Sequence, residues 1–158
     1  MNKQDKKFMN LAIKLSLKGS ASGKGGPFGA VVVKSGKIIA QDHNRVISIN
    51  DPTAHAEMVV IRKACKKLKT FNLSGCELYT SCEPCPMCLG AIYWSRLKMV
   101  YFANTKKDAA KIGFDDLFIY KEIDRPINKR KTRFKQLMQK EAASVFNLWK
   151  NKIDKKIY

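Results

Sequence analysis

The sequence predicts one α/β domain of three layers, with helices on both faces of a mixed sheet. Three observations favour it: an amphipathic helical stripe opens the chain, two β-branched runs flank a Ser-Gly turn, and strand-like and helical runs then alternate up to residue 103. Such alternation is typical of a sheet sandwiched between helices, whose later strands pair in parallel. The 158 residues, 45% hydrophobic, suit a single core, so we expect one domain over residues 1–158.

The N-terminal third predicts a helix followed by a β-hairpin. The apolar residues of the helix stand at positions i, i+3, i+4 and i+7: Phe8, Leu11, Ala12 and Leu15. A glycine-rich loop over 19–29 is too polar and flexible for the interior of an element. The run over 30–41 then predicts two strands joined by a turn at Ser35 and Gly36.

In the rest of the chain, predicted helices and strands alternate. Helical spacing over 61–68 is followed by a short strand at 77–81, helical spacing again over 85–92, and a strand at 99–103. Apolar residues at helical spacing over 142–153 predict a final helix after a basic stretch.

Composition restricts the class of protein. No run of about 18 uncharged apolar residues occurs, so we expect a soluble, cytoplasmic protein. Four of the five cysteines fall within residues 76–88, a poor basis for a disulfide framework and a better one for metal binding in a reducing compartment. The net charge of +18 is compatible with a nucleic-acid partner, but the lysines are spread along the chain, as on a merely solvated surface.

Two short motifs carry the chemistry: His55-Ala-Glu57 and Cys85-Pro-Met-Cys88. Both stand at predicted helix starts, the first capped by Asp51 or Thr53 and the second opened by Pro84 or Pro86.

These motifs predict a zinc site. Cys85 and Cys88 are three residues apart, so on the predicted helix they lie one turn apart on one face, where two thiolates can bind one zinc ion, and His55 supplies a third ligand. Three protein ligands leave the fourth position to water, which is typical of a catalytic zinc. Glu57 lies within reach of that water as the proton carrier. A lone C-x-x-C is more typical of a structural zinc or a redox pair, but neither explains Glu57.

The H-x-E and P-C-x-x-C motifs together are the known signature of zinc nucleobase deaminases. The chain resembles the cytidine-deaminase-like superfamily, and the runs NDPTAHAEMVVIRKAC, LYTSCEPCPMCLGAIYWSR and GFDDLFIYKEI resemble the small bacterial guanine deaminases in particular. The resemblance implies a cytidine-deaminase-like fold with a five-stranded sheet and one Zn²⁺ per subunit. It also implies a homodimer that exchanges its C-terminal segment, and conversion of guanine to xanthine and ammonia.

The resemblance assigns further residues to the substrate. Asn44 matches the asparagine that holds the purine ring, and Asp116 and Tyr158 match substrate-contacting residues. Phe28 could stack on the base. Plain structural roles also fit: a turn for Asn44, a helix cap for Asp116, a chain end for Tyr158 and a core position for Phe28. We expect His43 to be structural or exposed, and the cysteines outside the motif to be small buried residues: Cys65, Cys76 and Cys82.

Three other functions share these motifs in whole or part. A tRNA adenosine deaminase forming inosine would account for the positive charge, but the GFDDLFIYKEI block argues against it. A deaminase of cytosine or a nucleoside would use the same zinc chemistry with a different pocket. A non-catalytic zinc module that binds RNA would have no need of Glu57.

Overall fold

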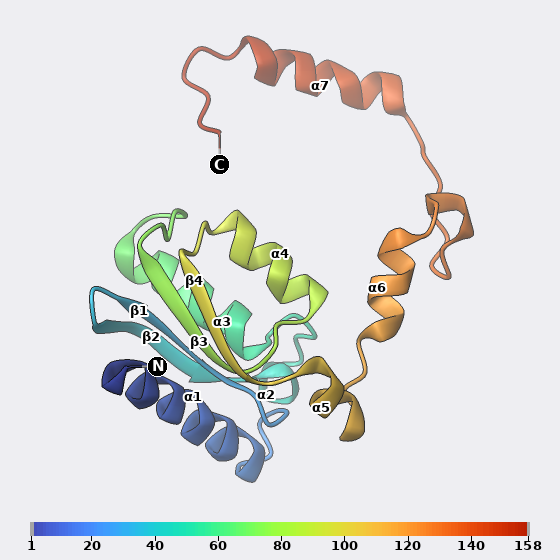
Figure 1. Ribbon diagram of the computed structural model, residues 1–158. Coiled ribbons are helices and arrows are strands. Elements are labelled where there is room, and N and C mark those ends of the chain that lie inside the picture. The colour runs from blue at the N-terminus through green and yellow to red at the C-terminus, as the bar shows by residue number, and fades with distance from the viewer. Residues whose placement is uncertain (1, 158) are drawn as a thin grey trace. The chain divides into compact units, whose positions relative to one another are not determined.

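The computed structural model describes residues 2–157, which divide into two compact units, residues 2–116 and 117–157. The first unit carries the sheet and the predicted metal ligands (Figure 1). Its elements are α1 (Lys3–Ala21), β1 (Gly29–Lys34), β2 (Lys37–His43), α2 (Val46–Ile49), α3 (Ala56–Leu68), β3 (Cys76–Cys82), α4 (Pro86–Trp94), β4 (Met99–Asn104) and α5 (Lys106–Lys111).

The sheet has the strand order β2-β1-β3-β4. β1 pairs antiparallel with β2 and with β3, while β3 and β4, joined through α4, pair in parallel. The predicted mixed sheet and parallel later strands are therefore confirmed. The predicted fifth strand is wrong: the described residues contain four strands. After β4 the side chain of Thr105 caps α5 in a reciprocal capping box with Asp108, so the chain turns helical directly after the fourth strand.

The hairpin between β1 and β2 turns where the sequence predicted. Ser35 and Gly36 both have positive φ, 48° and 74°, the backbone of a two-residue turn whose twist matches that of the flanking strands.

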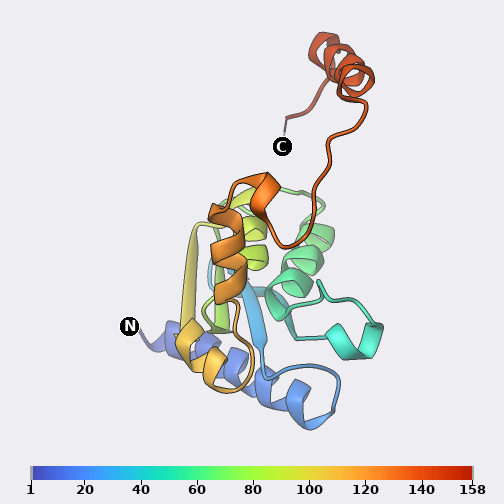
Figure 2. The ribbon, with the colours of Figure 1, turned by 90° about the vertical axis from the view of Figure 1, so that its right-hand side faces the viewer.

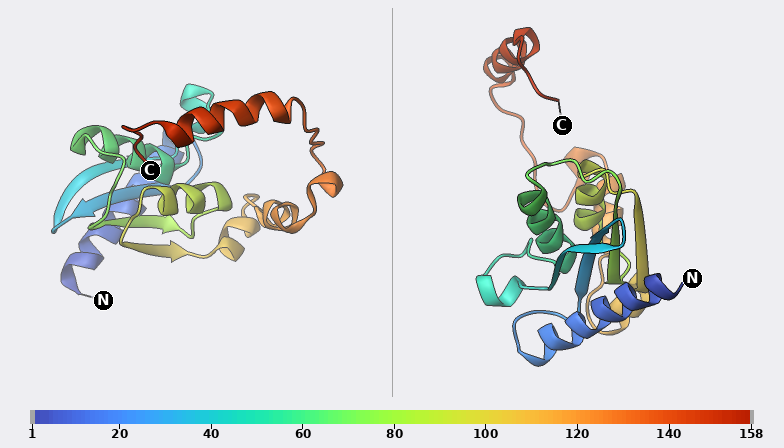
Figure 3. Two further views of the ribbon diagram at one scale, coloured as in Figure 1. Left: turned by 90° about the horizontal axis from the view of Figure 1, so that it is seen from above. Right: turned by 90° about the vertical axis from the view of Figure 1, so that its left-hand side faces the viewer.

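Helices cover both faces of the sheet in three layers, with α1 on one face and α3 and α4 on the other (Figures 2 and 3). β1 is buried on both faces and its side chains alternate between two cores. Val31 and Val33 pack with Phe8 and Ala12 of α1. Ala30 and Val32 join the larger core beneath α3: Ala40, Ala56, Val60, Ile61, Ala64, Leu73, Cys76, Leu78 and Ile92.

Of the two helices that carry the motifs, α3 begins later than we predicted. α3 begins at Ala56 with His55 at its N-cap, so neither Asp51 nor Thr53 caps it. Asp51 instead accepts hydrogen bonds from the backbone N–H and the hydroxyl of Thr53, at 2.8 and 2.7 Å, and so orders the approach to the helix. In α4 the first position is Pro86, as predicted. Its N-cap is Cys85, which has extended backbone, so the two cysteines are not stacked on one helical face.

The C-terminal unit contains α6 (Leu117–Asp124), η1 (Ile127–Lys129) and α7 (Gln139–Asn151). α7 confirms the predicted final helix, although Ile153 lies beyond its end. None of the residues 117–157 is buried. No helix among residues 2–157 is long and apolar enough to cross a bilayer.

Candidate metal centre and active site

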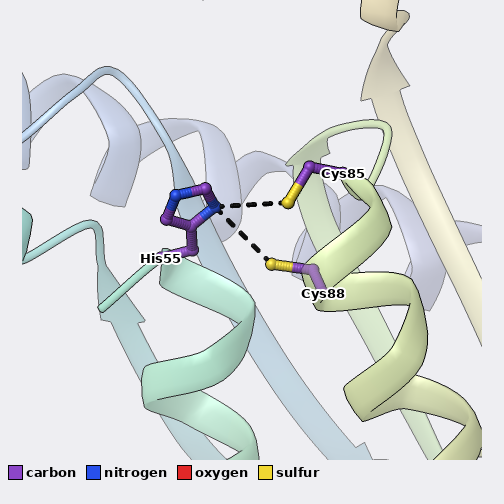
Figure 4. A group of neighbouring side chains, drawn as sticks. All are labelled: His55, Cys85 and Cys88. Atoms are coloured by element: carbon purple, nitrogen blue, oxygen red, sulfur yellow. Dashed lines mark hydrogen bonds between the residues drawn. The ribbon is translucent and has the colours of Figure 1, made fainter. Parts of the chain in front are cut away.

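His55, Cys85 and Cys88 converge at the adjacent N-terminal ends of α3 and α4 (Figure 4). The Nδ1 atom of His55 lies 3.5 Å from the Sγ of Cys85 and 3.7 Å from the Sγ of Cys88. His55 and Cys85 reach this point because each occupies an N-cap, where extended backbone directs the side chain over the helix end. Cys88 stands on the first turn of α4 and is fully buried.

These separations fit a tetrahedral zinc ion. With Zn–S bonds of about 2.3 Å and Zn–N bonds of about 2.0 Å, tetrahedral angles place a nitrogen and a sulfur ligand roughly 3.5 Å apart. The two N···S distances in the cluster, 3.5 and 3.7 Å, are close to this value. The ligand set of one imidazole and two thiols is one that zinc prefers.

The charges of the three groups also favour a cation. Hydrogen bonds from Cys88 and from His55 lower the pKa of Cys85 to about 4, so this group is a thiolate at neutral pH. The bond to Cys85 raises the pKa of His55. Interaction with the Cys85 thiolate, together with burial, raises the pKa of Cys88, which therefore keeps its proton until a metal displaces it.

Glu57 lies beside this cluster on the first turn of α3, with 5% of its surface exposed. Its Oε2 atom is 3.6 Å from the Sγ of Cys88, and its Oε1 atom accepts a hydrogen bond of 2.7 Å from the hydroxyl of Thr80. Burial raises the pKa of the carboxyl group, and the bond from Thr80 opposes that rise. A carboxyl whose pKa lies closer to neutrality both accepts and returns a proton readily.

Asn44 and Phe28 are brought together at the end of the hairpin. The backbone N–H of Asn44 donates to the carbonyl of Phe28 at 2.9 Å. Asn44 is 4% exposed, and its Oδ1 accepts the backbone N–H of Val46 at 3.1 Å. The side chain thus closes a local turn, the plain structural role that fits this residue, and an amide nitrogen can donate hydrogen bonds.

Asp116 approaches the cluster from the loop after α5. Burial and the nearby Cys85 raise the pKa of its carboxyl. Phe114, two residues earlier, makes an edge-to-face contact with Phe28, with ring centroids 4.9 Å apart. This contact joins the glycine-rich loop to the loop that carries Asp116. Tyr158 lies outside the described residues.

The remaining histidine and cysteines take the predicted structural roles. His43 is buried, and its Nδ1 lies 2.8 Å from the carbonyl oxygen of Asn44. Cys76 and Cys82 are buried, whereas Cys65 is half-buried. Burial and the nearby Glu57 raise the pKa of Cys82 to about 11, and its sulfur contacts the carbonyl of Thr105 at 3.7 Å, away from the three ligands.

Sequence reasoning missed three residues that the structure places around the site: Gly25, Thr80 and Phe114. No sequence signal singled out Thr80, because β-branched residues are common in strands. Phe114 belongs to the quoted GFDD run, yet no spacing rule links it to Phe28. Gly25 appeared only as one of several glycines in a flexible loop.

The chain is similar to known zinc-binding deaminases. Residues 2–104 match the family model described as cytidine and deoxycytidylate deaminase zinc-binding region. The chain is 56% identical over 151 residues to guanine deaminase of Bacillus subtilis, covering 96% of this chain and 97% of that protein. The crystal structure of a Bacillus subtilis guanine deaminase superposes with a TM-score of 0.94 at 54% identity, over 100% of this chain and 99% of that one. A tRNA-specific adenosine deaminase of Aquifex aeolicus is 38% identical, over 77% of this chain and 78% of its own length.

Proposed function

The chain belongs to the cytidine and deoxycytidylate deaminase zinc-binding family, and we propose that it hydrolyses guanine to xanthine and ammonia. The observation that carries the reaction type is the position of the buried Glu57 carboxylate beside three zinc ligands. The identity of 56% to a guanine deaminase, against 38% to a tRNA-specific adenosine deaminase, favours guanine as the base.

His55, Cys85 and Cys88 hold the zinc ion, one per subunit. A zinc ion held there would lower the pKa of a water molecule and so supply a nucleophile near neutral pH. Glu57 takes one proton from the attacking water and gives it to a ring nitrogen. It then takes the second proton, from the hydroxyl formed at the attacked carbon, and gives it to the amino group, which leaves as ammonia while that carbon becomes a carbonyl. The carboxylate suits this role because its Oε2 atom faces the ligand cluster while its Oε1 atom is held by Thr80.

Three described residues contact the base. The amide of Asn44 donates to a ring acceptor, since its oxygen is engaged by Val46. Asp116 accepts from N–H groups of the guanine edge, and Phe28 packs against the ring face. Tyr158, which lies outside the described residues, is assigned to the substrate by the family resemblance alone.

The protein is a homodimer whose C-terminal segment is exchanged between subunits, so that residues 1–158 form one functional domain. Residues 117–157 include no buried residue, and α7 exposes large apolar side chains: Val145, Phe146, Leu148 and Trp149. A segment of this size without a core of its own requires a surface to dock on, and a second copy supplies one. Two zinc-binding thiolates require reduced cysteines, which the cytoplasm maintains.

The test is ammonia release by the zinc-loaded protein given guanine, with adenine, cytosine, their nucleosides and tRNA in parallel. We expect xanthine from guanine and no inosine in tRNA. Inosine in tRNA with inert guanine would replace this proposal by tRNA adenosine deamination, a function that the net charge of +18 would also suit. Turnover of cytosine or a nucleoside alone would point to a different small base.

A further inference from the structure

We infer that Thr80 is a positioning residue, whose hydroxyl holds the carboxylate of Glu57 in the orientation that proton transfer requires. The inference deepens the proposed function and rests on it. It gives β3, one of the two inner strands of the sheet, a role in the reaction. Neither metal-binding motif contains a residue that orients the carboxylate of Glu57, and Thr80 of β3 does so.

The contact itself is short and buried. The Oγ1 atom of Thr80 donates to the Oε1 atom of Glu57 at 2.7 Å, across 23 residues of sequence. Thr80 has no exposed surface, and Glu57 is 5% exposed. A hydrogen bond to a carboxylate in such surroundings is stronger than one in water, because little solvent competes for either group.

The backbone of Thr80 is fixed by both neighbouring strands. β3 lies between β1 and β4, and Thr80 pairs with Ala30 on one side and Phe102 on the other. Its side chain is β-branched, so few χ1 rotamers are open to it. The sheet therefore holds the hydroxyl of Thr80 in place, and its position does not depend on α3 or α4, the helices at whose starts the candidate ligands lie.

The bond from Thr80 leaves the other oxygen of the carboxylate facing the cluster. The Oε2 atom of Glu57 lies 3.6 Å from the Sγ of Cys88, one of the three candidate ligands. Thr80 therefore fixes one oxygen of the carboxylate while the second stays next to the ligands.

Ser81 provides a matched control. It is the next residue along β3, it is 3% exposed, and its hydroxyl also makes a buried hydrogen bond. That bond is accepted from the backbone N–H of Gly29 at 3.0 Å, so it does not involve Glu57. Ser81→Ala removes a buried hydroxyl from β3 without touching Glu57, so it shows the effect of losing such a hydroxyl alone. Replacing Thr80 adds the loss of the contact to the carboxylate.

The kinetic experiment compares Thr80→Val, Thr80→Ser and Ser81→Ala, each loaded with zinc, with guanine as substrate. For Thr80→Val we expect kcat to fall about tenfold to a hundredfold, with KM changed less than about threefold and zinc still stoichiometric. Thr80→Ser should restore kcat to within about threefold of the parent, because it keeps the hydroxyl. Ser81→Ala should leave kcat within about twofold. If Thr80→Val does not accumulate as folded protein, Thr80→Ala takes its place.

A second measurement needs no substrate. Thermal unfolding of the zinc-loaded protein is compared for Thr80→Val alone, Glu57→Ala alone and the two together. We expect Thr80→Val to lower Tm in the parent and not in the Glu57→Ala background, because removing both partners leaves neither group unsatisfied.

The results separate the two claims. A parent protein without guanine deaminase activity overturns the proposed function, while the unfolding series still tests the pair. An active parent in which Thr80→Val keeps its kcat, or in which Thr80→Ser is as impaired as Thr80→Val, overturns the positioning role. Equal losses of Tm in both backgrounds would also overturn it.

Discussion

Gly25 lies directly against Asn44: a Cβ atom built on Gly25 would stand 2.4 Å from both the carbonyl oxygen and the Oδ1 atom of Asn44. Both oxygens are already engaged, the carbonyl with His43 and Oδ1 with the backbone N–H of Val46. Neither can move without breaking a hydrogen bond. The glycine is therefore required by this close approach.

Replacing Gly25 by alanine should displace Asn44 and weaken recognition of guanine. We expect kcat/KM to fall about tenfold to a hundredfold with zinc content unchanged, because the displaced amide no longer meets the ring. Gly90→Ala is the control, since no atom lies within 4 Å of its added Cβ. Steady-state kinetics with guanine and metal analysis check both variants, and equal activity in the two would contradict the role of this contact.

Glu57→Gln should abolish most turnover without loss of metal. The amide keeps the shape of the side chain and can still accept from Thr80, but it cannot carry a proton. We expect kcat to fall about a hundredfold to ten thousandfold, with stoichiometric zinc. Single-turnover assays with guanine measure this loss. Turnover near that of the parent would exclude Glu57 as the proton carrier.

Zinc binding at pH 5, below the pKa of a zinc-bound water, should release about two protons and not three. Cys85, with a pKa of about 4, has mostly lost its proton, whereas Cys88, whose pKa is raised, gives up one. His55 gives up another because its pKa is raised from 6.5. Calorimetric titration of metal-free protein in buffers of different ionisation enthalpy measures the number. Release of about three protons would mean that Cys85 is an ordinary thiol.

Cys82→Ala should retain zinc, whereas Cys88→Ala should lose it. Cys82 contacts Thr105 and has a pKa of about 11, so it stays protonated and outside the ligand set. Cys88 lies within the three-residue cluster. Metal content after dialysis distinguishes the variants. We expect stoichiometric zinc and kcat within about threefold of the parent for Cys82→Ala.

Stability should show an acid-dependent contribution from the cap of α5. The hydroxyl and then the backbone N–H of Thr105 lower the pKa of Asp108 to about 2 from 3.8. The folded state therefore favours the carboxylate, so this contribution is present above pH 3.8 and is lost as pH falls towards 2. Tm of metal-free Asp108→Asn should lie below that of the parent at pH 5 and approach it near pH 2. Thr105→Ala should show the same convergence, and a constant Tm difference across this range would contradict the assignment.

The sequence by itself predicted the cluster of His55, Cys85 and Cys88, the place of Glu57 beside it and most of the secondary structure. His55, Glu57, Cys85 and Cys88 stand in short motifs whose spacing reflects chemistry, and the strands and helices follow from local apolar periodicity. The hairpin turn at Ser35 and Gly36 was equally readable, because turn residues act within a few positions of the chain.

Tertiary structure alone decided the count of strands and the contacts that join distant segments. Four strands stand where the family resemblance implied five, since the cap of Thr105 starts a helix after β4. The N-caps fall on His55 and Cys85, and their extended backbone brings the two side chains to one point. The bond from Thr80 to Glu57 and the contact of Phe28 with Phe114 join segments far apart in sequence, and such pairs arise only when the sheet and its helices pack.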